Sequence, residues 1–246
     1  MVNFRLSIEN LPAFGGCNSG FASPVSKIKM DVSTKSKTES RAEFKANPRI
    51  HRGPGNSPTP SELIEGTLSE ASGVIKSVIP LTPFIYKIAQ AVIDTFDSGN
   101  RVLVIGNGGS AADAQHFAAE MVVRYKENGI PLPVIALTTD TSILTAIGND
   151  FDFDQIFARQ VEAISKRGDL LLALSTSGSS RNILRAVEVA KRLSLFTVGL
   201  TGRDGGRLAS LCHLSIKVPD ITTSNIQVAH LAILHAVCEV VEQQKR

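Results

Sequence analysis

The sequence predicts an α/β fold in which a doubly wound, five-stranded parallel sheet is covered by helices on both faces, as a three-layer sandwich. Two observations support this prediction. Short runs that are almost continuously apolar and rich in branched residues are typical of strands buried on both faces. Segments with helical spacing of apolar residues alternate with these runs, and such alternation builds a parallel sheet. The expected strands are residues 101–106, 133–138, 169–175, 195–201 and 213–218.

Helices are expected before, between and after these strands. The first should begin at a cap, either Ser61 or the preceding Thr59, and the second should follow Pro83 and end at Gly99. The last segment, SNIQVAHLAILHAVCEVVEQQKR, is unusually apolar for a surface helix, so we expect the sheet or another subunit to bury it. The helices expected between the strands are residues 110–126, 154–167, 179–193 and 205–211.

The chain divides into an N-terminal extension, residues 1–60, and one domain, residues 61–246, of ordinary size. The extension contains eight Ser and six Pro and is basic, so we expect it to be disordered or loosely attached. An organelle transit peptide is an alternative, which the four acidic residues of the extension weaken. Met30 is an alternative start of a shorter product.

Composition excludes several classes of protein. No apolar run approaches the roughly 20 residues of a membrane span, and the first residues make a poor secretory signal. Three widely spaced cysteines suggest neither disulfides nor a thiolate zinc site. Residues 61–246 carry 17 Lys and Arg against 19 Asp and Glu, with no basic stripe for nucleic acid. We therefore expect a cytoplasmic protein without a membrane or nucleic-acid partner.

A glycine-rich turn, GNGGSA at residues 106–111, follows the first expected strand. Ligands of parallel α/β sheets bind at the carboxyl ends of strands, and this turn fits the dinucleotide pattern GxGxxA. Asp140, after the second strand, lies where a ribose-binding carboxylate would be expected. The small residues are equally consistent with a tight turn and no ligand. A P-loop is not supported, because GxxxxGK[ST] does not occur.

A second loop, STSGSS at residues 175–180, places five hydroxyl groups between a strand and a helix. A helix cap needs a single hydroxyl, whereas a phosphate is held by several hydroxyls, backbone N–H groups and a helix N-terminus. The loop therefore favours a phosphate site over a cap alone.

Polar residues of two helices suggest acid/base or metal chemistry. His116 and Glu120 are four positions apart and share one helix face. Gln227 and His235, eight positions apart, lie close to one face of the last helix, and His230 is offset from them. An exposed helical pair and a hydrogen-bonded core histidine are the simpler alternatives. Because burying an imidazole without a partner is costly, His235 should have one.

Five motifs in order resemble the phosphoheptose isomerase family. They are GNGGSAADAQHFAAEMVVRY, AIGNDFDFDQIFARQVEAI, GDLLLALSTSGSSRNILRAVEVAK, LTGRDGGRLA and IQVAHLAILH, and the resemblance covers nearly all of residues 61–246. It implies a sugar isomerase (SIS) fold, flavodoxin-like in its layers, and a homotetramer with active sites at subunit interfaces. The implied reaction converts sedoheptulose 7-phosphate to D-glycero-D-manno-heptose 7-phosphate, for lipopolysaccharide or other surface glycans.

The resemblance also implies roles for residues of this sequence. Glu120 and His235 are the implied catalytic acid/base pair. One zinc ion per subunit is implied, with His116, Glu120, Gln227 and His235 as ligands. Substrate contacts are implied for Asn107, Gly108, Gly109, Ser110, Glu120, Arg124, Asn149, Asp150, Ser175, Thr176, Ser177, Ser180 and Gln227.

The chemistry of an aldose–ketose isomerisation fits these residues. A proton moves between C1 and C2 through an enediol, which requires a base, an acid and polarisation of the carbonyl, without a redox cofactor. Zinc bound by His, Glu and Gln is a workable Lewis acid, although a ligating carboxylate loses basicity. The zinc is therefore either catalytic or partly structural. Since a solvated carboxylate is a weak base, we expect neighbouring subunits to close the site around Glu120.

Two other functions compete with the isomerase. A non-catalytic SIS protein that binds the replication initiator resembles SAADAQHFAA and ALTTDTSILTAI, but that group lacks the catalytic pair that Glu120 and His235 form here. A nicotinamide-dependent oxidoreductase would use the GxGxxA turn, and leaves the serine loop unexplained. The sequence does not separate seven-carbon from six-carbon phosphosugars, because both share the phosphate and the C1/C2 chemistry.

Overall fold

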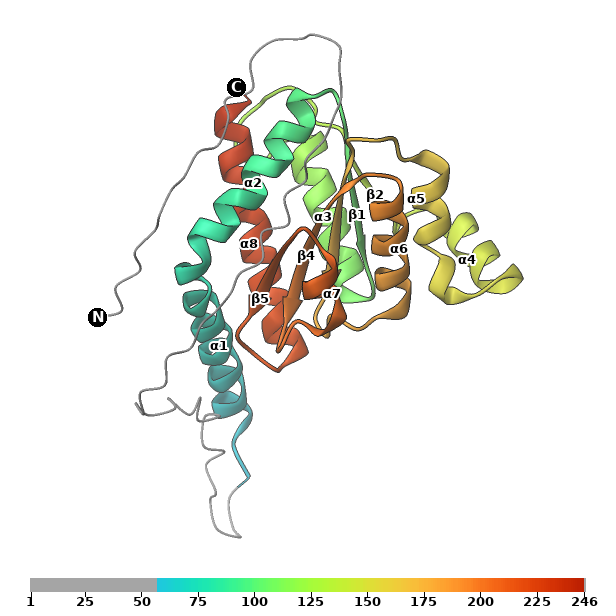
Figure 1. Cartoon of the computed structure of the whole chain (residues 1–246). Helices are drawn as coiled ribbons and strands as arrows, with labels where there is room; N and C mark the ends of the chain where they lie inside the picture. The colour runs from blue at the N-terminus through green and yellow to red at the C-terminus, as the bar shows by residue number, and fades with distance from the viewer. Residues whose placement is uncertain (1–56, 246) are drawn as a thin grey trace, which may run out of the picture. The chain divides into compact units, whose positions relative to one another are not determined.

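The computed structural model describes residues 57–245, which form a parallel sheet between two layers of helices (Figure 1). The strand order is β2-β1-β3-β4-β5, and all neighbours pair in parallel. Because the chain leaves β1 in one direction and later returns past it to β3, the carboxyl ends of β1 and β3 flank the topological switch point, where such sheets bind ligands. The strands are β1 (Val102–Gly106), β2 (Val134–Ala136), β3 (Leu170–Ser175), β4 (Phe196–Gly202) and β5 (Leu214–Val218).

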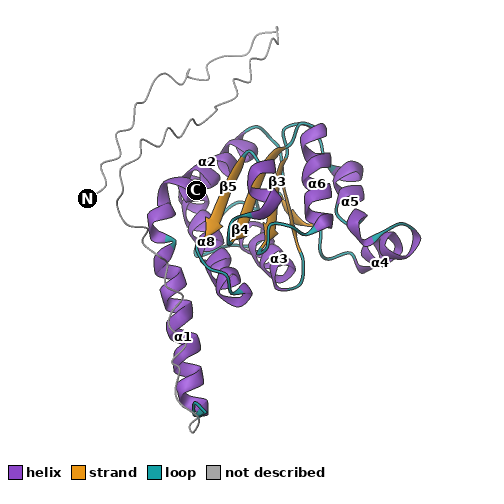
Figure 2. Cartoon of the chain, turned by 60° about the horizontal axis from the view of Figure 1, so that its bottom comes forward, coloured by secondary structure: helices purple, strands orange, loops and turns teal. Residues whose placement is uncertain are grey.

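The helices cover both faces of the sheet (Figure 2). One layer contains α1 (Pro60–Ser77), α2 (Thr82–Asp97), α3 (Gly109–Val122) and α8 (Thr223–Gln244), and the other contains α4 (Thr141–Asp150), α5 (Ala158–Ile164), α6 (Arg181–Arg192) and α7 (Gly206–Leu211). Short 3₁₀ turns at Ile79–Leu81 and Phe153–Gln155 complete the elements.

The strands alternate between two hydrophobic cores, one beneath each helix layer. Val102 and Val104 of β1 belong to the core under α2, α3 and α8, whereas Leu103 and Ile105 belong to the core under α5 and α6. All five residues of β1 are buried, as are the six of β3. The continuous apolar runs that predict these strands therefore reflect burial on both faces.

Helix α1 projects from the rest of the domain (Figure 2). Thr59 caps it in a reciprocal capping box with Glu62, as expected for one of the two candidate caps. Val74 is its only buried residue, and Ile64, Leu68 and Ile75 are exposed at helical spacing. An apolar stripe with this spacing is typical of a helix that packs against another chain.

Helix α8 is the apolar C-terminal helix, and it packs against α1, α2 and α3 and the sheet. By length and composition alone it is apolar enough to cross a membrane, but half of that window is buried inside the domain. His230 is fully buried and bonds the carbonyl of Thr201 through Nε2 at 3.1 Å. These contacts identify α8 as a core helix.

Several boundaries differ from those expected. The helix α4 was not predicted, although Ile143, Leu144 and Ile147 have helical spacing; only Ile147 of α4 is buried. The helix expected over 154–167 is a 3₁₀ turn followed by α5, and α3 ends at Val122 rather than at 126. Helix α1 begins at Pro60, and the extension expected over residues 1–60 lies almost wholly outside the described residues.

Candidate functional site

The loop after β1 enters α3 through glycines. Gly108, the N-cap of α3, has a φ of 53°, in the left-handed region that favours glycine. Gly109 packs directly beneath the side chain of Gln227 from α8, since a Cβ on Gly109 would lie 2.4 Å from Nε2 of Gln227. Ser110, the next residue, is buried. The turn therefore admits the close approach of α8 to the N-terminus of α3.

The serine loop follows β3 and leads into α6. Ser180 is the N-cap residue of α6, but its side chain makes no capping hydrogen bond. Its hydroxyl instead lies 3.3 Å from that of Ser175. Ser177 accepts from the backbone N–H of Ser179 at 3.2 Å. The first N–H groups of a helix have no intrahelical acceptor, so the hydroxyls and this helix N-terminus together can hold an anion.

His116, Glu120 and His235 converge from two helices. Nε2 of His116 lies 2.9 Å from Nε2 of His235 and 3.3 Å from Oε1 of Glu120. The two imidazole rings are tilted, with centroids 5.1 Å apart. His235 therefore has the partner expected for a partly buried imidazole. Side-chain exposure is 44% for His116 and 21% for Glu120, so the cluster is accessible in the single chain.

The three donor atoms lie within 4.8 Å of one another and fit a metal ion. Two donors that share a tetrahedral zinc at about 2.0–2.1 Å are roughly 3.3 Å apart. The measured N···N and N···O distances, 2.9 and 3.3 Å, are close to that spacing. Imidazole nitrogen and carboxylate oxygen are donors that zinc accepts. Gln227, two turns before His235 on α8, lies over Gly109 at the N-terminus of α3.

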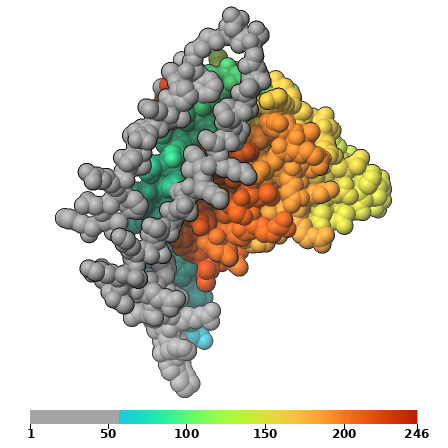
Figure 3. Space-filling view, viewed as in Figure 1, coloured from blue at the N-terminus to red at the C-terminus, as the bar shows by residue number. Residues whose placement is uncertain are grey.

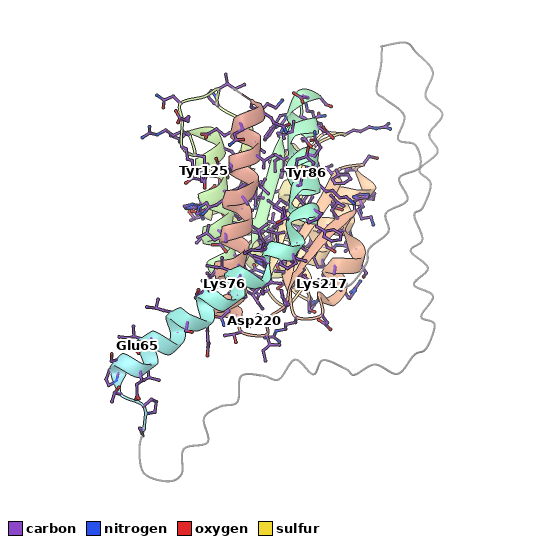
Figure 4. All side chains as sticks on the ribbon, turned by 90° about the vertical axis from the view of Figure 1, so that its left-hand side faces the viewer. Glu65, Lys76, Tyr86, Tyr125, Lys217 and Asp220 are labelled. Carbon is purple, nitrogen blue, oxygen red and sulfur yellow. The ribbon has the colours of Figure 1, made fainter. Side chains whose placement is uncertain are left out.

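Three further residues lie near this cluster. Asp113, one turn before His116, is partly buried, and burial raises the pKa of its carboxyl, an effect that a charged His116 opposes. Tyr125 lies beyond the end of α3, where α3 and α8 run side by side (Figure 4), and its ring centroid is 5.7 Å from that of His235. Arg124, one turn after Glu120, is exposed and lines a small cavity of about 30 Å³ together with Glu120.

Asn149 and Asp150 are not brought to this cluster by the single chain. They end α4, where Asn149 donates to Asp150 at 2.7 Å and both are exposed. Helix α4 packs mainly on the following 3₁₀ turn and forms the outer edge of the second layer (Figure 3).

A hollow of about 400 Å³ is lined by Arg181, Leu184 and Glu188 of α6. Arg181 in it pairs with Asp154, and Arg207 pairs with Glu188 at 3.4 Å. Because each of these charges is already matched, the hollow offers less for a phosphate than the serine loop does. The volume of a surface hollow therefore does not identify the substrate site of this protein.

Asn182 and Tyr125 also lie next to the site, although the sequence did not predict them there. Asn182, in the first turn of α6, exchanges two hydrogen bonds with Asn107. The position of Asn182 just after the serine loop was the sequence feature that could have indicated its role. No feature of the sequence indicated Tyr125, because its contact with His235 depends on how α8 packs.

Comparisons with known proteins identify the family. The SIS domain family matches residues 70–202. A phosphoheptose isomerase of Helicobacter hepaticus is 45% identical over 182 residues, which are 74% of this chain and 93% of that protein. The chain belongs to the phosphoheptose isomerase family. The phosphoheptose isomerase structure of Francisella tularensis has 37% identity and a TM-score of 0.73, covering 76% of this chain and all of that one. That of Neisseria gonorrhoeae has 38% identity and a TM-score of 0.69, with 75% and 100% coverage.

Membership of this family confirms the predicted resemblance and the predicted fold class. Asp140 was the expected ribose-binding carboxylate of the nicotinamide alternative. In the structure it is instead the N-cap of α4, where its side chain accepts from the backbone N–H of Ile143 at 2.9 Å. None of the relatives named above favours a non-catalytic initiator-binding protein.

Proposed function

We propose that this chain interconverts sedoheptulose 7-phosphate and D-glycero-D-manno-heptose 7-phosphate by proton transfer through an enediol. The observation that carries the proposal is the convergence of His235 from α8 on Glu120 and His116 from α3. The phosphoheptose isomerase relatives support the same reaction.

The phosphate is held by the serine loop in this proposal. Ser175, Thr176, Ser177 and Ser180 supply hydroxyls at the uncapped N-terminus of α6. The helix dipole and its free N–H groups favour a dianion there. The β1 loop, through Asn107, Gly108, Gly109 and Ser110, then contacts the sugar at the neighbouring strand end.

Glu120 and His235 carry the proton transfers. The carboxylate of Glu120 takes a proton from C1 of the ketose while the imidazole of His235 donates one to the oxygen at C2, giving the enediol. Glu120 then returns a proton to C2 while His235 removes one from the oxygen at C1, giving the aldehyde. Atoms and electrons balance without an external oxidant or reductant.

A zinc ion held by His116, Glu120, His235 and Gln227 would polarise the substrate oxygens as a Lewis acid when bound. The spacing of His116, Glu120 and His235 supports their part of this assignment. Gln227 already lies against Gly109, at the N-terminus of the helix that carries His116 and Glu120.

We further propose a homotetramer with sites completed by neighbouring chains. The exposed stripe of Ile64, Leu68 and Ile75 on α1 requires an apolar partner, and a second copy of the stripe provides one. Asn149 and Asp150, exposed on α4, would then reach the site of a neighbour and help to exclude water from Glu120.

The proposed setting is the cytoplasm, where the product feeds heptose synthesis for lipopolysaccharide or other surface glycans. No membrane or nucleic-acid partner belongs to the proposal. The near balance of charges in residues 61–246 supports this, because a nucleic-acid site needs excess positive charge.

The test is incubation of the purified chain with sedoheptulose 7-phosphate, with and without chelator, followed by detection of the aldose product. We expect turnover that chelation lowers. A wild-type chain that is inert at every zinc loading, yet retains a replication initiator on an affinity column, would replace the isomerase with the binding-protein alternative.

A further inference from the structure

Asn107 and Asn182 form a reciprocal amide pair between the two loops of the site. Nδ2 of Asn107 donates to Oδ1 of Asn182 at 2.9 Å, and Nδ2 of Asn182 donates to Oδ1 of Asn107 at 2.8 Å. Asn107 follows β1 and Asn182 lies in the first turn of α6 after β3, so the pair bridges the switch point of the sheet.

The backbone decides which way both amides face. The N–H of Ile183 donates to Oδ1 of Asn182 at 2.9 Å. A backbone N–H can only donate, so the atom that it meets must be the oxygen of Asn182. The nitrogen of Asn182 is thereby fixed on the other side, where it must face the oxygen of Asn107. One peptide group of α6 thus sets the orientation of two side chains.

The pair leaves a defined donor and a defined acceptor on Asn107. A carboxamide has two N–H donors and two acceptor positions on its oxygen, and Asn107 uses one of each for Asn182. Asn182 is 2% exposed, whereas Asn107 is partly exposed. A ligand in the cleft can therefore reach the remaining N–H and lone pair of Asn107, but not Asn182.

We propose that Asn182 is a positioning residue for the isomerisation, acting through Asn107. It holds the amide of Asn107 in one orientation and ties the sugar-contacting loop to the helix that receives the phosphate. This inference rests on the proposed function, in which Asn107 contacts the phosphosugar. Asn182 itself touches no substrate.

A double-mutant cycle tests whether Asn182 affects substrate binding through Asn107. We expect Asn182→Ala to raise KM for sedoheptulose 7-phosphate about tenfold, the scale of one lost oriented hydrogen bond, with a smaller change in kcat. If Asn182 acts through Asn107, the double variant with Asn107→Ala has the same kcat/KM as Asn107→Ala alone. Two losses that multiply would overturn the proposal.

Asn182→Asp separates hydrogen-bond direction from packing. It preserves volume and the acceptor for Ile183, but removes the donor, so one oxygen faces another in either orientation of Asn107. We expect KM to rise at least as much as in Asn182→Ala. Gln160→Ala is the matched control, because the carboxamide of Gln160 is also buried but donates to the carbonyls of Leu137 and Ile156, away from both loops. In this variant KM should stay unchanged while the midpoint of thermal unfolding falls. Wild-type KM in Asn182→Asp would refute the proposal.

Hydrogen exchange of the Asn107 side-chain amide provides a readout without turnover. In ligand-free protein labelled with ¹⁵N in asparagine, this NH₂ signal should be protected, and Asn182→Ala should abolish the protection at an unchanged fold. Unaltered exchange in the variant would overturn the positioning role even in an active enzyme. Lost protection in a chain that does not turn over sedoheptulose 7-phosphate would leave the positioning role standing and remove the proposed reaction instead.

Discussion

The Nε2 atoms of His116 and His235 lie 2.9 Å apart, although 119 positions separate the two residues in the chain. Without a metal, two imidazole nitrogens at this distance need one proton between them, so one ring donates to the other. With a metal, both lone pairs can point at the ion. Packing of α3 against α8 therefore brings the two Nε2 atoms together so that they can share either a proton or a metal cation.

Loss of either proposed proton carrier should abolish turnover. Glu120→Gln and His235→Gln retain size and hydrogen bonding but remove the basic group, and general acid–base catalysis contributes roughly 10²–10⁴-fold. We expect kcat to fall within that range in each variant, measured with sedoheptulose 7-phosphate. The oligomeric mass should not change. A variant that keeps more than a tenth of wild-type kcat contradicts the assigned role of its residue.

Zinc should bind the folded chain and stabilise it. At a free concentration about 100 times Kd, a ligand specific to the native state adds about 2.7 kcal/mol to the free energy of unfolding. We expect zinc to raise the midpoint of thermal unfolding, and His116→Ala to remove most of this rise. His213→Ala, whose ring bonds Thr197 away from the cluster, serves as the control. Equal stabilisation of both variants would show that zinc binds elsewhere.

Gly109→Ala should displace Gln227. The added Cβ would lie 2.4 Å from Nε2 of Gln227, so the carboxamide must move. We expect weaker zinc binding by equilibrium dialysis, on the order of tenfold, since the loss of one oriented contact is worth about 1 kcal/mol. Gly129→Ala meets nothing within 4 Å and should bind zinc normally. Zinc affinity that Gly109→Ala leaves intact would argue against Gln227 as a ligand.

Acidification should destabilise the fold through His230. Burial lowers the pKa of His230 from 6.5 to about 4, with the hydrogen bond to Thr201 opposing that shift. The unfolded chain therefore binds a proton that the native chain excludes, and stability falls as pH drops from about 6.5 toward 4. The loss from this residue is about 3 kcal/mol at pH 4, given about 1.36 kcal/mol per pKa unit.

Unfolding in denaturant at a series of pH values measures this effect. His230→Leu removes the titrating group, so the stability of the variant should depend less steeply on pH over that interval. The variant should also be less stable at pH 7, because the carbonyl of Thr201 loses its donor. An equally steep pH dependence in both proteins would mean that other groups account for it.

The apolar stripe of α1 should hold the oligomer together. Leu68 is 65% exposed in the single chain, and Leu68→Glu would place a charge in the proposed interface. We expect sedimentation to show dissociation, with activity lost because neighbouring chains no longer complete the site. Glu70→Lys changes charge on the opposite side of α1 and should leave the oligomer intact. An unchanged assembly of the Leu68 variant would exclude this stripe as the interface.

The chain's local patterns were sufficient for the strands and most helices. The strands β1 and β3 are buried on both faces, so their apolarity is continuous and visible without an alignment. The cap of α1 at Thr59 could be read from neighbouring residues for the same reason, since a capping box is a contact over three positions. Helix α4 was not predicted, although Ile143, Leu144 and Ile147 have helical spacing.

The features of the candidate site also divide into those that the sequence predicts and those that depend on tertiary packing. Sequence alone determined the residue types, the spacing of His116 and Glu120 on one face, and the hydroxyl-rich turn after β3, because these depend on local geometry. Only the tertiary structure decided that His235 meets His116, that Gln227 lies on Gly109, and that Asn182 orients Asn107. Those contacts join segments far apart in the chain. Their geometry depends on how α3, α6 and α8 pack around the sheet, which no local pattern encodes.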